Sequence, residues 1–302
     1  MIEYITFLIV GLIGLWISAD KTVDNAEKLI KALGIPAFLF GAVFMSVSTG
    51  LPEIATAVIS AYEGVPGLSA GDITGSSLVN LTFVLGITVI ASKGMELHGE
   101  DLDLIRTGGI ATMIAALVLI IFQELSFPVV ALLFIIYGVF LYRAEHTAFK
   151  MDEEGAKASK KTIFKTLLGV TALLISARSM VFGAKGLGEA LGIPIEVLGA
   201  TVIAVGTGLP ELAFEISAVK KGDTSLALGD IFGSTLVNIT LTLGILGLMS
   251  SPSMVPLIPV LLGLVFVAAL AMFFSWRGEF SVLEASVLLL VFFTYIGLQV
   301  AY

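Results

Sequence analysis

The motif Thr-Gly-Leu-Pro-Glu occurs twice in this chain, at residues 49–53 and at residues 207–211. Each copy lies inside a long apolar run, where both a proline and a carboxylate are costly. A second shared motif, Gly-Asp-Ile-x-Gly-Ser-x-Leu-Val-Asn, follows at residues 71–80 and at residues 229–238. The matched positions are 158 residues apart in every case. The chain therefore contains an internal repeat whose best-matched residues are polar ones in apolar surroundings.

The composition is typical of a protein with many membrane spans. Of the 302 residues, 57% are hydrophobic and 13% are charged, whereas soluble domains are about 45–50% apolar and about 25% charged. About ten stretches approach the roughly 20 apolar residues that a spanning helix needs. We expect spans at residues 2–19, 35–62, 68–91, 107–123, 126–144, 162–182, 193–219, 224–249, 254–276 and 280–301. The first stretch has neither a basic flank nor a small-residue cleavage motif, so it is expected to be a span rather than a signal peptide.

The basic residues predict the orientation of these spans. The polar segment 143–165 is expected to join two five-helix halves at the membrane surface. With this linker in the cytoplasm, 14 of the 16 Lys and Arg residues lie on the cytoplasmic side, and only Arg178 and Lys185 lie opposite. Both termini are then outside, in an integral protein of the cell membrane.

The odd number of spans in each half predicts that the second half enters the bilayer from the opposite side. The expected fold is therefore an all-α polytopic membrane protein with ten transmembrane helices in two inverted five-helix repeats, a common plan of secondary transporters. The expected divisions are a first repeat at 1–145, a cytoplasmic linker at 146–162 and a second repeat at 163–302. A duplication kept only for packing is the alternative.

Several classes of function are excluded by composition. The net charge of −8 leaves no basic patch for nucleic acid. Cysteine is absent, so disulfides and thiolate metal sites are excluded. No nucleophile–base pair and no His-Glu-x-x-His motif is found, which argues against an enzyme. The expected partners are the lipid bilayer and inorganic cations, and the sequence indicates neither a cofactor nor a protein partner.

The first motif predicts helix breaks that carry a carboxylate. Proline lacks the backbone N–H and glycine loosens the same turn, so breaks are expected at Gly50–Pro52 and at Gly208–Pro210. Backbone carbonyls freed at membrane depth are tolerated only inside protein or in a wet cavity. Together with Glu53 and Glu211 they would form a hard-oxygen site for Ca²⁺, Mg²⁺ or Na⁺. A packing kink is the alternative, and it explains the prolines but not the carboxylates.

The second motif places an aspartate, a serine and an asparagine at i, i+4 and i+8, on one helix face. These residues are Asp72, Ser76 and Asn80 in the first half, and Asp230, Ser234 and Asn238 in the second. The serines and asparagines are candidate cation ligands, and interhelical hydrogen bonds worth about 0.6 kcal/mol each are the alternative. The aspartates follow glycines at the predicted starts of spans, so they are expected either to cap helices or to line the access path. Gly75 and Gly233 allow a neighbouring helix to approach closely.

One acid in a predicted span has no acidic counterpart in the other half of the repeat. Glu215 corresponds to Ala57 in the first half. We expect Glu215 to form a charge pair with Lys220 or Lys221 near the cytoplasmic end of its helix, with a secondary role in the site as the alternative.

The paired motifs resemble the calcium:cation antiporter superfamily, and specifically its sodium/calcium exchangers. The two alpha-repeats of that family correspond to Ala42–Gly86 and Ala200–Gly244, and the resemblance covers the whole chain. It implies Glu53 and Glu211 as the principal Ca²⁺ and Na⁺ ligands. The other cation-binding residues that it implies are Ser76, Asn80, Ser234, Asn238, Thr49, Thr207 and the carbonyl groups of Ser46 and Ala204. The first and sixth spans would form a sliding gate.

The resemblance implies an antiporter that exchanges Ca²⁺ for Na⁺ by alternating access, with both ions competing for one mid-membrane carboxylate site. The chain departs from the family at Gly50 and Gly208, where serine is frequent, and at Asn238, where microbial relatives often have aspartate. Asp72 and Asp230 stand where a neutral residue is expected. These departures leave H⁺-coupled exchange of Ca²⁺ or another divalent cation as the main alternative, followed by a cation channel.

Overall fold

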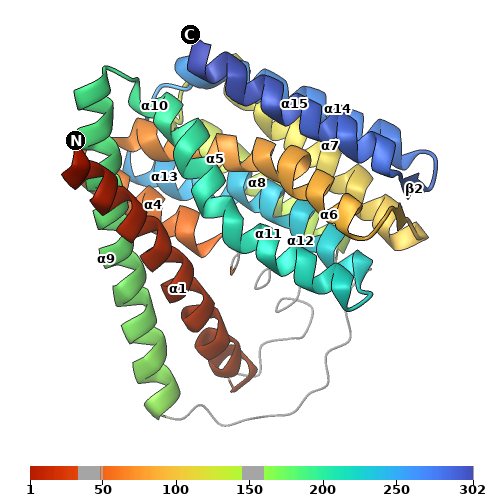
Figure 1. The fold of residues 1–302 in the computed structure, drawn as a ribbon, viewed down its shortest axis with the longest axis horizontal. Helices are drawn as coiled ribbons and strands as arrows, with labels where there is room; N and C mark the ends of the chain where they lie inside the picture. Colours follow the sequence, from red (N-terminus) through yellow and green to blue (C-terminus); the bar gives the residue numbers. More distant parts are fainter. Residues whose placement is uncertain (33–47, 49, 145–159, 302) are drawn as a thin grey trace.

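The computed structural model describes residues 1–32, 48, 50–144 and 160–301, and this part of the chain is almost entirely helical (Figure 1). The elements of the first half are α1 (Ile2–Ala32), α4 (Leu51–Tyr62), α5 (Pro66–Val79), the π-helical turn η2 (Asn80–Val84), α6 (Leu85–Ala91), β1 (Met95–Glu96), α7 (Gly99–Phe122) and α8 (Phe127–Ala144). Those of the second half are α9 (Lys160–Leu191), α10 (Ile195–Leu198), the π-helical turn η4 (Gly199–Ile203), α11 (Ala204–Lys220), α12 (Thr224–Val237), the π-helical turn η5 (Asn238–Thr242), α13 (Leu243–Met249), the 3₁₀ turn η6 (Val255–Leu257), α14 (Ile258–Ser275), β2 (Glu279–Phe280) and α15 (Val282–Ala301). The predicted helical class is confirmed.

Within the described residues, eight helical segments are long and apolar enough to cross a membrane. They are Ile2–Ala19, Pro66–Ala91, Asp101–Phe122, Lys161–Leu191, Ile195–Lys220, Thr224–Met249, Val255–Ser275 and Val282–Gln299. The shorter apolar helices Leu51–Tyr62 and Phe127–Arg143 lie where the other two spans are predicted. Part of the predicted span 35–62 lies outside the described residues.

Helices α1 and α9 are longer than the apolar stretches that predict them. The predicted spans cover only residues 2–19 and 162–182, but good helix formers such as Ala, Glu and Lys extend both helices further. The two helices pack against each other on one side of the molecule (Figure 1). A Cβ atom at Gly183 would lie 2.4 Å from the Leu8 backbone nitrogen, so only glycine permits this approach.

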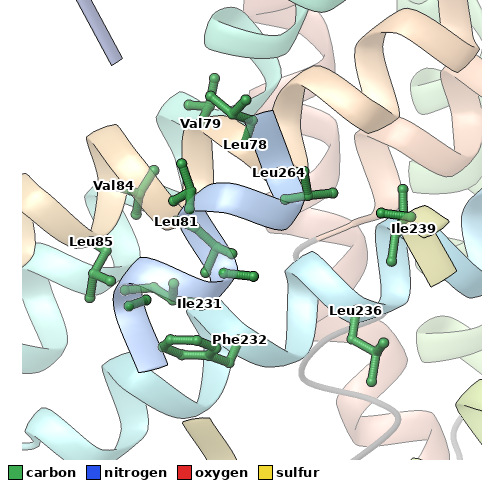
Figure 2. Packing of buried hydrophobic residues seen from close by; sticks show 14 of the residues in the cluster. Leu78, Val79, Leu81, Val84, Leu85, Ile231, Phe232, Leu236, Ile239 and Leu264 are labelled. Carbon is green, nitrogen blue, oxygen red and sulfur yellow. The ribbon is translucent and has the colours of Figure 1, made fainter. Parts of the chain in front are cut away.

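The centre of the molecule is formed by two equivalent segments, Pro66–Ala91 and Thr224–Met249. Of the residues that identify each segment as a span, 83% are buried, compared with 28–50% in the other spans. Their α, π and α parts have identical lengths and are offset by 158 residues. Lipid is as apolar as leucine, so van der Waals packing rather than the hydrophobic effect holds such helices together. Leu81 and Leu85 lie in this core with Phe232 of α12 and Leu264 of α14 (Figure 2).

Two short backbone pairings connect the halves at opposite ends of α7. At its N-terminal end, Met95 of β1 pairs with Phe280 of β2 in an antiparallel arrangement. At its C-terminal end, Glu124 forms an isolated antiparallel bridge with Ser253. Because α7 has 24 residues, it holds these pairings about 36 Å apart.

Candidate cation site

Glu53 and Glu211 are both buried at the centre of the described structure, with exposed fractions of 0% and 2%. Glu53 lies in the first turn of α4, and Glu211 lies in the middle of α11. Their carboxyl groups are close enough to repel each other directly. The structure therefore brings together the two acids of the repeated motif.

The first copy of the motif coincides with the start of a helix. Gly50 is the N-cap of α4, and Pro52 lies in its first turn. Proline is well tolerated there, because the first turn of a helix has no intrahelical partner for its backbone N–H groups. The predicted break at Gly50–Pro52 agrees with this arrangement. Thr49 and Ser46, two predicted ligands, lie outside the described residues.

The second copy of the motif adopts a different backbone. The predicted break at Gly208–Pro210 is wrong, because both residues lie inside the continuous helix α11. A proline inside a helix is tolerated where neighbouring elements support the chain, even though it leaves one carbonyl of the preceding turn without an intrahelical donor. The irregular part of this span is instead the π-helical turn η4, which precedes α11. Tyr295 donates a hydrogen bond from its hydroxyl to the carbonyl of Ala200 in this turn.

Both candidate asparagines begin a π-helical turn. Asn80 is the first residue of η2, and Asn238 is the first residue of η5. Such turns occur frequently at functional sites, because they change the direction of side chains without ending the helix. Composition does not predict them. The repetition of Asn-x-Thr at residues 80–82 and 238–240 is the only trace that they leave in the sequence.

Asp72 and Asp230 are not helix caps. The N-cap of α5 is Val65, and that of α12 is Asp223, whose side chain accepts a hydrogen bond of 3.0 Å from the Leu226 N–H. The predicted capping role is wrong because α5 starts at Pro66, six residues before Asp72, and α12 starts at Thr224, six residues before Asp230. The two aspartates therefore lie inside their helices, and both are buried.

Asp72 belongs to a polar network that joins the two halves. Its Oδ1 atom lies 3.0 Å from Thr207 Oγ1 and 3.3 Å from Ser76 Oγ. The two hydroxyl oxygens lie 3.2 Å apart, and Ser76 Oγ lies 3.4 Å from the carbonyl oxygen of Ala204. Four predicted site residues thus meet where α5 crosses α11. Gly75 confirms the expected close approach, because a Cβ atom there would lie 2.6 Å from the carbonyl oxygen of Ala200.

The asparagines supply further polar atoms. Asn80 donates from Nδ2 to Ser234 Oγ at 3.0 Å, which again joins the halves. Its Oδ1 atom and both amide atoms of Asn238 are buried without a hydrogen-bond partner among the described residues. Asn80 also lies beside Glu211. Neutral oxygens are therefore available close to the carboxylates.

The glutamates have polar neighbours, Thr207 near Glu53 and Asn80 near Glu211, but form no close hydrogen bond with them. All four carboxyl oxygens of Glu53 and Glu211 are buried without a hydrogen-bond partner in the described part of the chain. A buried acid in this state is strongly unfavourable unless a cation or a proton neutralises it. Within the same residues, no group of three or more acidic, His or Cys side chains is already arranged around a metal position. A cation here would therefore also need the neutral oxygens.

Glu215 corrects a further prediction. It was expected to pair with Lys220 or Lys221, but its side chain is fully buried, whereas both lysines are exposed. Glu215 instead lies beside Asp230 and Glu211. Arg178 lies on α9 and forms an ion pair of 3.1 Å with Glu63 at the end of α4.

Many apolar helices around buried carboxyl groups are typical of membrane proteins that move ions. The sequence model of the sodium/calcium exchanger protein family matches residues 3–144 and 161–301. The chain therefore belongs to the sodium/calcium exchanger family of membrane antiporters, as the paired motifs predicted. The family consists of exchangers rather than enzymes.

Individual relatives agree with this assignment. The chain is 26% identical over 291 residues to the sodium/calcium exchanger MaX1 of Methanosarcina acetivorans, covering 80% of this chain and 81% of the relative. It is 30% identical over 255 residues to a putative antiporter, CaxA, of Alkalimonas amylolytica, covering 79% and 78%. A solved structure of the sodium-calcium exchanger NCX_Mj, soaked with Na⁺ and Sr²⁺, superimposes with a TM-score of 0.69 at 25% identity over 98% of both chains. The protein is thus a polytopic membrane protein that acts on inorganic cations.

Proposed function

We propose that this antiporter exchanges Ca²⁺ for Na⁺ by alternating access, with both ions bound in turn between Glu53 and Glu211. The observation that carries the proposal is that these two acids are buried within electrostatic range of each other, and that none of their four carboxyl oxygens forms a hydrogen bond among the described residues. Relatives named as sodium/calcium exchangers support the same pair of ions.

Charge balance explains why the two ions would exclude each other. Two carboxylates neutralise one Ca²⁺, two Na⁺ or two protons. Ca²⁺ and Na⁺ together would leave excess positive charge in a medium of low dielectric constant. The unloaded, doubly charged pair is costly as well, so the protein would change its accessible side mainly when loaded. The protein would therefore exchange one ion for another instead of letting ions leak across the membrane.

Neutral oxygens complete the proposed site. Ser76, Thr207 and the Ala204 carbonyl approach it from the crossing of α5 and α11. Asn80, Ser234 and Asn238 approach it from the π-helical turns and α12. Hard cations such as Ca²⁺ take six to eight oxygen ligands, so a mixture of carboxylate, amide, hydroxyl and carbonyl oxygens suits them. Thr49 and Ser46 are proposed as the first-half equivalents of Thr207 and Ala204. Asp72 and Asp230 are assigned here to the access path.

The two halves are proposed to be inverted five-helix repeats, with boundaries at 1–145 and 163–302 and a cytoplasmic linker between them. The positions of two loops support the inversion. Met95 and Ser253 are equivalent in the repeat, 158 residues apart, yet they pair at opposite ends of α7. A two-fold axis in the membrane plane exchanges the two ends of a bundle in this way. The ten-span count and the outward position of both termini complete this proposal.

H⁺-coupled exchange is the second candidate, and specific residues favour it. Glycine at positions 50 and 208 leaves the motif without two hydroxyl groups that could bind Na⁺. Buried glutamates can accept protons instead. Proteoliposomes that contain the purified chain separate the two candidates. A Na⁺ gradient should drive uptake of radioactive Ca²⁺, and a pH gradient alone should not. Uptake driven by the pH gradient alone, with no response to Na⁺, would refute Na⁺ coupling.

The same assay tests the carboxylate pair. Glu53→Gln and Glu211→Gln are each expected to abolish Ca²⁺ transport, because one remaining carboxylate cannot neutralise a divalent ion. Glutamine keeps the size of the side chain, so the yield of folded protein should stay close to that of the original chain. Glu189→Gln, at an exposed glutamate of α9, is the matched control and should transport normally. Retained transport in either site variant would remove that residue from the centre of the mechanism.

A further inference from the structure

The hydrogen bonds of Asp72 indicate a role beyond the access path, because they reach two hydroxyl groups of the proposed site. Asp72 lies inside α5, and its side chain is completely buried. Its Oδ1 atom accepts hydrogen bonds from Thr207 Oγ1 at 3.0 Å and from Ser76 Oγ at 3.3 Å. Ser76 lies on the same helix, whereas Thr207 lies on α11. One carboxyl oxygen therefore controls a hydroxyl group from each half of the chain.

Three neutral oxygens form a triangle next to this carboxyl group. Ser76 Oγ lies 3.2 Å from Thr207 Oγ1 and 3.4 Å from the carbonyl oxygen of Ala204, and Thr207 Oγ1 lies 3.5 Å from the same carbonyl oxygen. Two perpendicular ligands of a hard cation lie about 3.3–3.7 Å apart, because metal–oxygen distances are about 2.3–2.6 Å. The spacing of this oxygen triangle therefore suits a cation, on condition that lone pairs rather than protons point into it.

The direction of two hydroxyl protons decides whether this condition is met. Each hydroxyl group has one proton to donate and two lone pairs. Without Asp72, the Ser76 proton has Thr207 Oγ1 and the Ala204 carbonyl as its acceptors, and either bond would occupy the oxygen triangle. The Thr207 proton would turn to the carbonyl of Ile203 or of Ala204. When Oδ1 of Asp72 accepts both protons, the lone pairs of all three oxygens stay available for a cation.

We propose that Asp72 is a positioning residue that draws the hydroxyl protons of Ser76 and Thr207 away from the transported cation, so that the oxygen triangle can bind it. The inference rests on the proposed function, because it concerns neutral ligands of the same site. Asp72 acts through the two hydroxyl groups and does not itself bind the ion. An amide oxygen accepts hydrogen bonds as well, so the position requires an acceptor and not a negative charge.

Two substitutions separate the acceptor from the charge. Asp72→Asn keeps an oxygen that accepts from both hydroxyl groups, whereas Asp72→Leu has a similar shape but no acceptor. Calorimetry on the purified full chain in lipid nanodiscs would measure binding of Ca²⁺ and Na⁺. Asp72→Leu should bind both ions at least about tenfold more weakly, the effect of one lost interaction between a neutral group and a charge. Asp72→Asn should stay within about threefold of the original affinities, because one neutral acceptor takes the place of the carboxyl oxygen.

Two results would overturn the proposal. Equal losses in Asp72→Asn and Asp72→Leu would show that the charge is required, and normal binding in Asp72→Leu would show that no acceptor is required. Asp72→Ala also lacks an acceptor and replaces Asp72→Leu if that variant does not fold.

The hydroxyl partner gives a readout that a merely structural role of Asp72 would not change. Thr207→Val removes one hydroxyl group and keeps the shape of the side chain. The losses of ion affinity in Thr207→Val and Asp72→Leu should not be additive, because both remove the same hydrogen bond. Additive losses would mean that Asp72 does not act through Thr207. Thr74→Val is the matched control, because the Thr74 hydroxyl is equally buried on α5 but donates to Ala70 of its own helix at 2.8 Å. It should leave both affinities unchanged, and a loss equal to that of Thr207→Val would contradict the proposal.

Glu211→Gln separates this inference from the proposed function. Unchanged Ca²⁺ binding in Glu211→Gln would refute the carboxylate site as a whole. A clear loss in Glu211→Gln, together with normal binding in Asp72→Leu, would refute only the role given to Asp72.

Discussion

The contact between Gly75 and Ala200 allows a sharp test of how the site is held. A Cβ atom at Gly75 would lie 2.6 Å from the Ala200 carbonyl oxygen and 2.7 Å from its Cα atom, and an ordinary contact begins at 3.4 Å. In Gly75→Ala, α5 must therefore move away from η4 by about 0.8 Å, because the obstacle is backbone rather than a flexible side chain. Overpacking of this kind typically costs about 1–3 kcal/mol.

The displacement acts directly on the neighbouring residue of the site. Ser76 lies 3.2 Å from Thr207 Oγ1 and 3.4 Å from the Ala204 carbonyl. A shift of about 0.8 Å takes both distances beyond hydrogen-bonding range. Functional constellations tolerate only about 0.5 Å of misplacement. Gly75→Ala is therefore expected to reduce Ca²⁺ transport at least about tenfold, since misplacement by about 1 Å can cost 100-fold.

The assay compares Gly75→Ala with Gly138→Ala on α8, where a Cβ atom would meet nothing within 4 Å. Both variants gain about 1 kcal/mol of helix propensity, so the difference between their unfolding free energies isolates the steric cost. Thermal unfolding and Ca²⁺ uptake would be measured at equal amounts of reconstituted protein. If Gly75→Ala matched Gly138→Ala in both measurements, the close approach of α5 and η4 would not hold the site, and the reasoning would be wrong.

Two further substitutions test elements around the site. Tyr295→Phe leaves the Ala200 carbonyl of η4 without its hydroxyl donor. The unfolding free energy should therefore fall by about 1–3 kcal/mol. An unchanged melting temperature would show that another donor satisfies this carbonyl. Glu215→Gln removes a buried acid beside Glu211 and Asp230. The melting temperature should therefore rise while Ca²⁺ uptake persists. A loss of uptake of tenfold or more would instead make Glu215 part of the site.

The fold and the site were predictable from the sequence to different extents. Apolar runs located the spans because membrane helices need long, uninterrupted apolar stretches, and the repeat led to both glutamates. The predicted starts of the two central spans, at residues 68 and 224, lie within two residues of the observed starts of α5 and α12. Capping was considered for Asp72 and Asp230 because each follows a glycine, but both aspartates lie inside their helices. The π-helical turns at Asn80 and Asn238 could not be predicted, because the same residues fit an ordinary α-helix.

The two copies of the proline motif show why local sequence alone was insufficient. Pro52 lies in the first turn of α4, whereas Pro210 lies within α11. Both prolines nevertheless belong to the same pentapeptide, Thr-Gly-Leu-Pro-Glu. The four described residues Gly-Leu-Pro-Glu thus accept two backbone arrangements. Packing around each copy decides between a helix start and a helix interior, and this packing is set by residues far away in the sequence.

Two kinds of buried acid among the described residues can be contrasted. Asp101 accepts from the His98 N–H at 2.8 Å, and Glu284 accepts from the Ser281 N–H at 2.8 Å. Both are local interactions at the start of a helix, between residues three positions apart, and they give the carboxylate a hydrogen-bond donor from its own segment. Glu53 and Glu211 are equally buried, but no hydrogen bond among the described residues satisfies their carboxyl oxygens. We therefore propose that a species from outside the protein neutralises them. In a member of an antiporter family, we expect that species to be the transported cation.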